Sequence, residues 1–524
     1  MALKSIILMM PITMVAVLLA GCSQSGGGPI TASAAASSAA PAPAPAPAPS
    51  PAPTPTPAPT PSPTTSPAGF VPVVVAQRPI PSDLFGYNFN VLRSADVLSR
   101  GDFRTNLRGL RAATLRIPGG TVGEYWSWAR GGLLPPPYIG LPAPPPFNAE
   151  QLALTGATIA AVDATLDAAD ATALFAINAL TRDLDTNIAD LRGFEAIGQP
   201  VRAIEIGNEE YFRTPNNVAR FPTASAYAAL ARDWSVALKA AFPAARTAAI
   251  APSPVRQTGI SFGDWVTAIE AANGWSTLDA IAIHPYAEIS FPVVARSDAE
   301  AMTGVTTLLA ADNAYLDAVR ARLPAAERIW ITEWNTNDNA TAPAFAGSWI
   351  HALSALARAL NFLDFSQVDY VLQHVVQGDL QWQAMTAADG RLINFGNWQS
   401  GTAIVAPFTL TASGRVMALL GDAMRGGGRA MKLNLGVDEQ STPVLGYRFV
   451  QADGDVVTVI VNASDRVLRF ALGGRARRLS ALPWSSPVTA AQMNETVLQL
   501  GGDGLAMPAF SAAIVDERGT AGLF

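Results

Sequence analysis

The fold prediction starts from residues Val201–Tyr211, which read Val-Arg-Ala-Ile-Glu-Ile-Gly-Asn-Glu-Glu-Tyr. Its first half is mostly apolar and of strand length, and it stops at a glycine that is followed by Asn208 and Glu209. A second stretch has the same construction, because Arg-Ile-Trp-Ile-Thr-Glu-Trp at Arg328–Trp334 is a short apolar run that ends in Glu333. We therefore expect two buried strands, each of which delivers one glutamate at its C-terminal end.

Apolar runs of strand length alternate with Ala- and Leu-rich helical patterns along the chain after Gly69. The eight candidate strands are Phe85–Phe89, Ala113–Ile117, Ala173–Ile177, Ala203–Ile206, Thr247–Ala251, Ala280–Ile283, Ile329–Ile331 and Val368–Leu372. Long helical patterns lie between several of them, at Glu150–Ala169, Ala224–Ala241, Ala299–Ala321 and Phe345–Leu363. Alternating strands and helices predict a parallel sheet in an α/β fold. Eight such units predict a (β/α)8 TIM barrel with its active site at the C-terminal ends of the strands.

Nearly every predicted strand releases a polar side chain at that end. These residues are Asn88 and Asn90, Arg116, Asn178, Asn208 and Glu209, Ser253, His284 and Tyr286, Glu333, and Gln373 and His374. Junctions between strands and loops are often polar, which accounts for some of the asparagines but poorly for the two glutamates. Two carboxyl groups that face one pocket are the apparatus for cleaving a glycosidic bond, and the retaining mechanism needs them about 5 Å apart.

The set Asn208-Glu209, His284-Pro285-Tyr286 and Glu333 resembles clan A of the glycoside hydrolases, which are retaining (β/α)8 enzymes. The resemblance covers the chain from Phe85 to His374. It implies a retaining glycoside hydrolase that acts on a polysaccharide or oligosaccharide, with Glu209 as the general acid/base and Glu333 as the nucleophile.

The resemblance also assigns supporting roles. Arg116 and Tyr286 would donate hydrogen bonds to Glu333, and Asn208 would contact the 2-hydroxyl of the sugar. His284 would orient Tyr286 or Glu209, although a packing role explains it equally well. The residues expected to bind substrate are Arg116, Asn178, Asn208, His284, Tyr286, Trp334 and Gln373.

For other acidic and aromatic residues near these positions, the sequence predicts less specific roles. Glu205 is expected to be a structural polar contact, and Glu210 to face away from Glu209. Trp126 and Trp128 join Trp334 as candidates for sugar-stacking walls. For Trp349 and Trp382, core packing is at least as good an explanation.

Different parts of this sequence resemble two different families of the clan. Leu115–Gly120 (Leu-Arg-Ile-Pro-Gly-Gly) and Glu333-Trp334-Asn335 look like family 51 α-L-arabinofuranosidases, but Thr121 and the asparagine that ends the first strand depart from that pattern. Ile177–Leu180 and Ile204–Glu209 look like family 79 β-glucuronidases, which lack the proline at 118. The resemblance leaves the sugar open. A surface glycan-binding pseudo-glycosidase without catalysis is the alternative function, although the presence of both acids favours an enzyme.

The composition of the chain argues against nucleic-acid binding and against a His/Cys metal site. The chain has 524 residues, of which 49% are hydrophobic, and a net charge of −6 without a run of lysine or arginine, so nothing indicates nucleic-acid binding. Three histidines and a single cysteine argue against a His/Cys metal site, and we expect no metal and no cofactor.

The N-terminus has the pattern of an exported protein. Ser5–Leu18 is almost wholly apolar and too short to span a bilayer, as in a signal peptide. Leu19-Ala20-Gly21-Cys22 resembles the lipobox of bacterial lipoproteins, although an ordinary signal peptide with a chance cysteine remains possible. The resemblance implies a lipid on Cys22, and Ser23 after it implies the outer membrane of the cell envelope. Residues 23–68 are rich in alternating Pro and Ala, which predicts an extended spacer.

The barrel is expected to span residues 69–404 and a C-terminal all-β sandwich residues 405–524. From about Pro407 short strands and turns are expected, with a hairpin of Leu445–Val450 and Val456–Val461 around an Asp-Gly turn. Phe510–Val515 is expected as a late strand, and Phe70–Val75 as a strand that joins the sandwich.

Overall fold

The computed structural model describes residues 69–94, 97–255, 259–289, 297–338, 348–377, 382–386, 391–392, 403–404, 406–439, 441–481, 484, 493–519 and 522–523. The predicted signal peptide, the lipid-attachment residue Cys22 and the spacer lie outside the described residues. Within the described ranges, no helix combines the length and the apolar character needed to cross a bilayer.

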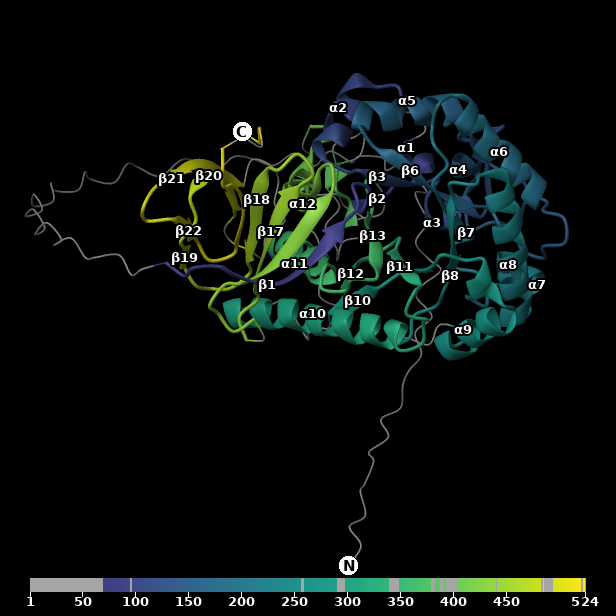
Figure 1. The fold of residues 1–524 in the computed structure, drawn as a ribbon. Helices are drawn as coiled ribbons and strands as arrows, with labels where there is room; N and C mark the ends of the chain where they lie inside the picture. The colour runs from purple at the N-terminus through teal and green to yellow at the C-terminus, as the bar shows by residue number, and fades with distance from the viewer. Residues whose placement is uncertain are drawn as a thin grey trace, which may run out of the picture. The chain divides into compact units, whose positions relative to one another are not determined.

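A closed barrel of eight parallel strands forms the larger part of the molecule (Figure 1). In order around the barrel they are β2 (Phe85–Asn88), β3 (Thr114–Ile117), β6 (Thr172–Ile177), β7 (Ala203–Ile206), β8 (Arg246–Ile250), β9 (Ala280–Ile283), β11 (Arg328–Ile331) and β13 (Val368–His374). The eight predicted strands are confirmed, with small shifts at their ends. Their residues are almost all buried, because side chains face either the barrel interior or the surrounding helices.

Helices follow the strands. The longer ones are α2 (Gly101–Gly109), α5 (Ile159–Ala169), α6 (Leu184–Ala196), α8 (Ala224–Ala241), α9 (Phe262–Ala271), α10 (Asp298–Arg320), α11 (Trp349–Phe362) and α12 (Ala412–Met424). The single helix predicted over Glu150–Ala169 is instead two, α4 (Ala149–Ala153) and α5. Gly156 at φ 107° interrupts the pattern, and Thr158 starts a new helix by accepting a hydrogen bond from the backbone N–H of Ala161.

Short elements complete this part of the chain. They are α1 (Val91–Ser94), α3 (Gly120–Gly123), α7 (Pro215–Arg220), the 3-10 helix η1 (Gly274–Ser276), β4 (Trp126–Ser127), β5 (Gly132–Leu133), β10 (Tyr286–Ile289), β12 (Asn335–Asp338), β14 (Arg391–Leu392) and β15 (Ala403–Ile404).

An antiparallel sheet of seven strands forms the C-terminal all-β part. Its order is β1 (Val73–Ile80), β16 (Gly428–Asn434), β17 (Val444–Gln451), β18 (Val456–Asn462), β23 (Ser511–Asp516), β20 (Gly474–Ser480) and β21 (Asn494–Leu500). The predicted hairpin is β17–β18, and the segment before the first barrel strand joins the sheet as β1, as expected. The short strands start later than predicted, at Gly428, because helix α12 comes first.

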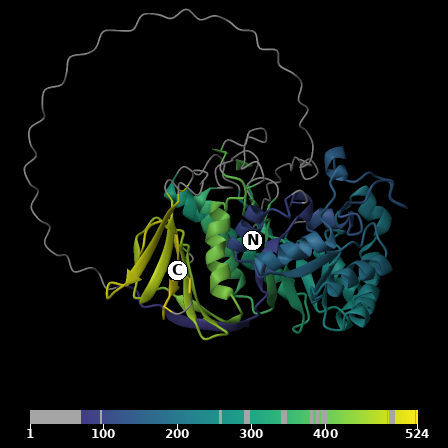
Figure 2. The ribbon, with the colours of Figure 1, turned by 90° about the horizontal axis from the view of Figure 1, so that it is seen from above.

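Helices α11 and α12 lie between this sheet and the barrel (Figures 1 and 2). Both contact β17 and β18, while α11 also contacts β13 and α12 contacts β2. On the other face of the sheet, the ribbon β19 (Leu468–Phe470) and β22 (Leu505–Met507) closes a smaller apolar core around Phe470 and Met507. The sandwich is therefore packed on the barrel through these two helices, and the two parts share one apolar core.

Candidate active site

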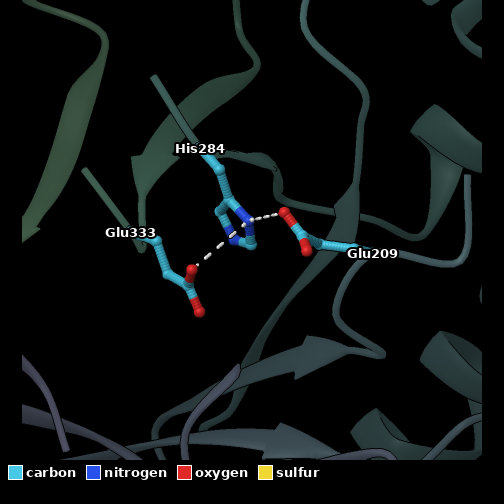
Figure 3. A group of neighbouring side chains, drawn as sticks. All are labelled: Glu209, His284 and Glu333. Atoms are coloured by element: carbon cyan, nitrogen blue, oxygen red, sulfur yellow. Dashed lines mark hydrogen bonds and ion pairs between the residues drawn. The ribbon is translucent and has the colours of Figure 1, made fainter. Parts of the chain in front are cut away.

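The structure brings Glu209 and Glu333 together at the C-terminal ends of β7 and β11. One carboxyl oxygen of each, together with a ring nitrogen of His284, lies within 4.8 Å of the others. His284 follows β9 and is drawn between the two carboxyl groups in Figure 3. This is the separation that double displacement at a sugar requires.

Glu333 is buried among hydrogen-bond donors. Its Oε1 accepts from Nη1 of Arg116 at 2.6 Å and from Nδ2 of Asn88 at 2.9 Å, and its Oε2 accepts from the hydroxyl of Tyr286 at 2.8 Å. Burial alone would raise the pKa of Glu333, but the charges of His284, His374 and Arg116 and the Tyr286 hydrogen bond lower it to about 2. The carboxyl group is therefore ionised at any ordinary working pH.

Arg116 is itself held by Glu205. Nε and Nη2 of the fully buried guanidinium donate to Glu205 at 2.8 and 2.9 Å, and Nη2 also donates to Oδ1 of Asn208 at 2.8 Å. Burial would raise the pKa of Glu205, but Arg116 and His284 lower it. Glu205 is a structural polar contact, as expected, and the bidentate geometry fixes the guanidinium against Glu333.

Glu209 is more accessible than Glu333, with 23% against 6% of the side chain exposed. Its Oε1 lies 3.0 Å from Nδ1 of His284 and accepts from the hydroxyl of Tyr211 at 3.0 Å. Burial would lower the pKa of His284, but Glu333, Glu205 and Glu209 raise it to about 10. The imidazole is therefore protonated at neutral pH and donates to Glu209, which is a more specific role than packing.

Three residues expected to bind substrate do not line this site. Gln373 is fully buried and donates to Ser413 of α12, and Trp334 is fully buried against Phe362 of α11. Both side chains leave the barrel outward, because neighbouring residues at a strand end point to opposite faces. Nδ2 of Asn178 donates to the hydroxyl of Thr181 and to the backbone carbonyl of Trp126, and its Oδ1 accepts from the N–H of Thr181. The described contacts of these three side chains do not reach the two acids, and their contact with substrate stays a prediction.

Among the five tryptophans considered, only Trp382 approaches the acids. Its ring lies 5.5 Å from that of Tyr286 and it is partly exposed. Trp126 and Trp128 pack against each other beside helix α6, and Trp349 is buried with its Nε1 donating to the backbone of the β sandwich.

Asn88 and His374 were missed as site residues, although both were visible at strand ends. Nδ2 of Asn88 lies 2.8 Å from Nδ1 of His374, and that nitrogen lies 3.7 Å from Oε2 of Glu333. The two complete the ring of donors around Glu333, together with Arg116 and Tyr286.

Glu209, His284 and Glu333 are also close enough to be considered as a metal-binding set. Both oxygens of Glu333 already accept hydrogen bonds from Arg116, Asn88 and Tyr286, and the guanidinium of Arg116 supplies the positive charge beside them. We therefore assign no metal ion to this group.

The sequence matches no protein-family model and no curated protein. The structure is similar to that of a family 51 α-L-arabinofuranosidase from Bifidobacterium longum, with a TM-score of 0.59, 16% identity, and coverage of 86% of this chain and 99% of that one. The GH51 arabinofuranosidase from Xanthomonas axonopodis pv. citri gives a TM-score of 0.58 at 17% identity, with coverage of 84% and 97%.

A 4-O-α-L-rhamnosyl-β-D-glucuronidase from Fusarium oxysporum 12S is also similar. Its TM-score is 0.56 at 17% identity, and the match covers 86% of this chain and 100% of that one. At these identities the likeness establishes the fold, which is a TIM barrel with an all-β region.

Proposed function

We propose that this chain is a retaining glycoside hydrolase, with Glu333 as the nucleophile and Glu209 as the general acid/base. The observation that carries the proposal is the approach of the two carboxyl groups to within 4.8 Å in unlike surroundings. Glu333 is buried among donors that keep it ionised, and Glu209 is the more exposed group, as a residue that must reach the leaving oxygen should be.

The steps follow from this arrangement. An oxygen of Glu333 attacks the anomeric carbon while the carboxyl proton of Glu209 passes to the glycosidic oxygen, so the aglycone leaves and a glycosyl ester forms on Glu333. Glu209 then takes a proton from water, which displaces Glu333 and restores both groups. Arg116, Asn88 and Tyr286 hold the carboxylate of Glu333 in place for the attack and receive it again when water displaces it.

The substrate we propose is a polysaccharide or oligosaccharide with arabinofuranosidase-like or β-glucuronidase-like chemistry. The sequence patterns at Leu115–Gly120 and Ile204–Glu209 support this choice, and so do structural neighbours with those two activities. The lipobox pattern supports export and attachment to the cell envelope, in the outer membrane, through a lipid on Cys22.

A panel of aryl glycosides (arabinofuranoside, glucuronide, xyloside and glucoside) tests the proposal on wild type, Glu333→Ala and Glu209→Ala. Glu333→Ala should lower kcat by at least about 10⁴-fold on any substrate that is turned over. Glu209→Ala should keep activity on activated aryl leaving groups and gain rate with added azide.

The control is Glu270→Ala, on the exposed face of α9. Turnover that survives in Glu333→Ala contradicts the mechanism, and glycan binding without turnover by wild type supports the non-catalytic alternative.

A further inference from the structure

Two glutamates outside the proposed reaction lie beneath the turn that presents Glu209. Glu210 follows Glu209 directly, and Glu124 follows helix α3 in the loop after the second barrel strand. Both are buried. Glu210 was expected to face away from Glu209, and its buried side chain folds back under its own backbone.

Both carboxyl groups face the backbone of this turn. Oε2 of Glu210 accepts from the N–H of Asn208 at 2.9 Å. Burial raises the pKa of Glu124, and the backbone N–H of Glu209 opposes that rise. Gly207 makes this possible, because its φ of 89° turns the chain and a Cβ there would lie 2.2 Å from Oε1 of Glu210. Glu210 thus fixes the backbone of Asn208, and the carboxyl of Glu124 faces the backbone of Glu209; these are the two residues whose side chains face the site.

Neither carboxyl group has a countercharge among the described residues. Oε1 of Glu124 and Oε1 of Glu210 are buried and accept no hydrogen bond. The charge of Arg116 acts on Glu124, but the N–H groups of Arg116 donate to Glu205, Glu333 and Asn208. Two buried carboxylates without a countercharge under the same turn are very costly, whereas one bound proton removes a charge and supplies a donor.

We propose that Glu124 and Glu210 are positioning residues that share at least one proton at neutral pH and thereby hold the turn that carries Glu209. Loss of that proton in alkaline solution places two negative charges under the turn and loosens it. The positioning role rests on the proposed function, whereas the protonation of the pair does not.

The surroundings of Glu124 and Glu210 support the presence of a bound proton at neutral pH. Burial, followed by the negative charges of Glu205 and Glu209, raises the pKa of Glu210 to about 8, although hydrogen bonds from its own N–H and that of Asn208 oppose this. Burial and the charge of Glu210 raise the pKa of Glu124 well above its usual range. The ionisable groups that face the pair are Glu205, Glu209, Arg116, Tyr125 and Tyr227.

Thermal unfolding between pH 5 and pH 9 tests the protonation without any substrate. A raised pKa in the folded state gives stability that is complete below the ordinary value of 4.5 and is lost as the pH rises through about 8. Glu210→Gln and Glu124→Gln remove that loss, so the Tm of each variant should rise relative to wild type as the pH increases. Glu270→Gln, the same change on exposed α9, should follow the wild-type profile throughout.

Parallel Tm profiles for wild type and both variants would overturn the shared proton. Failure of both variants to fold would also contradict it, because a pair that is protonated in the native state tolerates a neutral isostere.

Activity tests the positioning role. The ratio of kcat/KM at pH 8.5 to that at pH 6 should be at least about threefold larger for Glu210→Gln than for wild type. Glu210→Ala, which removes the acceptor of the Asn208 N–H, should lower kcat at least about tenfold at both pH values with little change in KM. An unchanged ratio and an unaffected Glu210→Ala would reject the role. A pH-dependent gain in Tm without glycosidase activity in wild type would leave the shared proton standing and reject the proposed function.

Discussion

Glu209 and Glu333 are the same residue type in two environments, and the difference lies in their neighbours. Glu333 accepts from a guanidinium, an amide and a phenol, whereas Glu209 faces a protonated imidazole and the opening of the barrel. Charge-assisted donors stabilise the anion of Glu333 and so separate the two roles.

Tyr286→Phe isolates one of these donors without changing the packing much. A hydrogen bond to a charged group contributes about 1.5–3 kcal/mol, so kcat should fall by about 10- to 100-fold. The pKa of Glu333 should rise, since a cause of its depression is lost, and the acid limb of kcat/KM should move to higher pH. Rates measured from pH 3 to pH 7 check this, because the wild-type limb near pH 2 lies below that range and the limb of the variant should enter it; a variant without an acid limb in that range would show that Tyr286 does not tune Glu333.

Sequence patterns could predict which strand ends carry acids, but not which face each side chain takes. Glu333 and Trp334 are adjacent, and so are His374 and Gln373, yet one of each pair lines the site and the other packs against a helix. A shift of one residue reverses the face. The strand-end pattern alone does not fix this register, so it does not tell that Gln373 and Trp334 pack against helices α12 and α11.

At the scale of elements, strand β1 links the two parts of the fold. Arg78 on β1 is buried and donates through Nη1 and Nη2 to the backbone carbonyls of Phe365 and Val368, at 2.8 and 2.6 Å. Strand β1 is paired with β16 of the sandwich, while Val368 starts barrel strand β13. The sandwich is therefore anchored to the barrel by polar contacts as well as by apolar packing.

Arg78→Ala should lower the free energy of unfolding by about 2–4 kcal/mol, because two buried carbonyls lose the charged donor, although the N–H of Val368 still donates to that of Phe365. Urea denaturation measures the change, and Arg429→Ala on the exposed side of β16 is the control. KM should not change, since Arg78 is not among the contacts of the two acids. A stability equal to that of the control would show that this link contributes little.

The barrel strands could be predicted because each is a short apolar run buried on both faces. Helix α12 could not, because Gly414 and Gly421 weaken its helical pattern. Both glycines are explained by tertiary contacts, since a Cβ would lie 2.1 Å from the carbonyl oxygen of Ala384 or 2.3 Å from that of Arg111. Close approach of another backbone segment, which a single sequence does not show, overrides helix propensity here.

At the scale of the whole molecule, the barrel collects side chains from five different strands into one site. Asn88, Arg116, Glu209, His284 and Glu333 follow or end strands that are remote in sequence and meet only because the barrel closes. The fold and the site therefore both depend on the closure of the barrel. The TIM-barrel neighbours at 11–17% identity show that this architecture persists when most residues differ.

The most direct measurement is covalent trapping with an activated 2-deoxy-2-fluoro glycoside of the sugar that the enzyme hydrolyses, followed by mass spectrometry of the digested protein. The account predicts one fluoroglycosyl group per chain, attached to the peptide that contains Glu333 and absent from Glu333→Ala. Attachment to any other residue, or hydrolysis with inversion and no trapped ester, would contradict it.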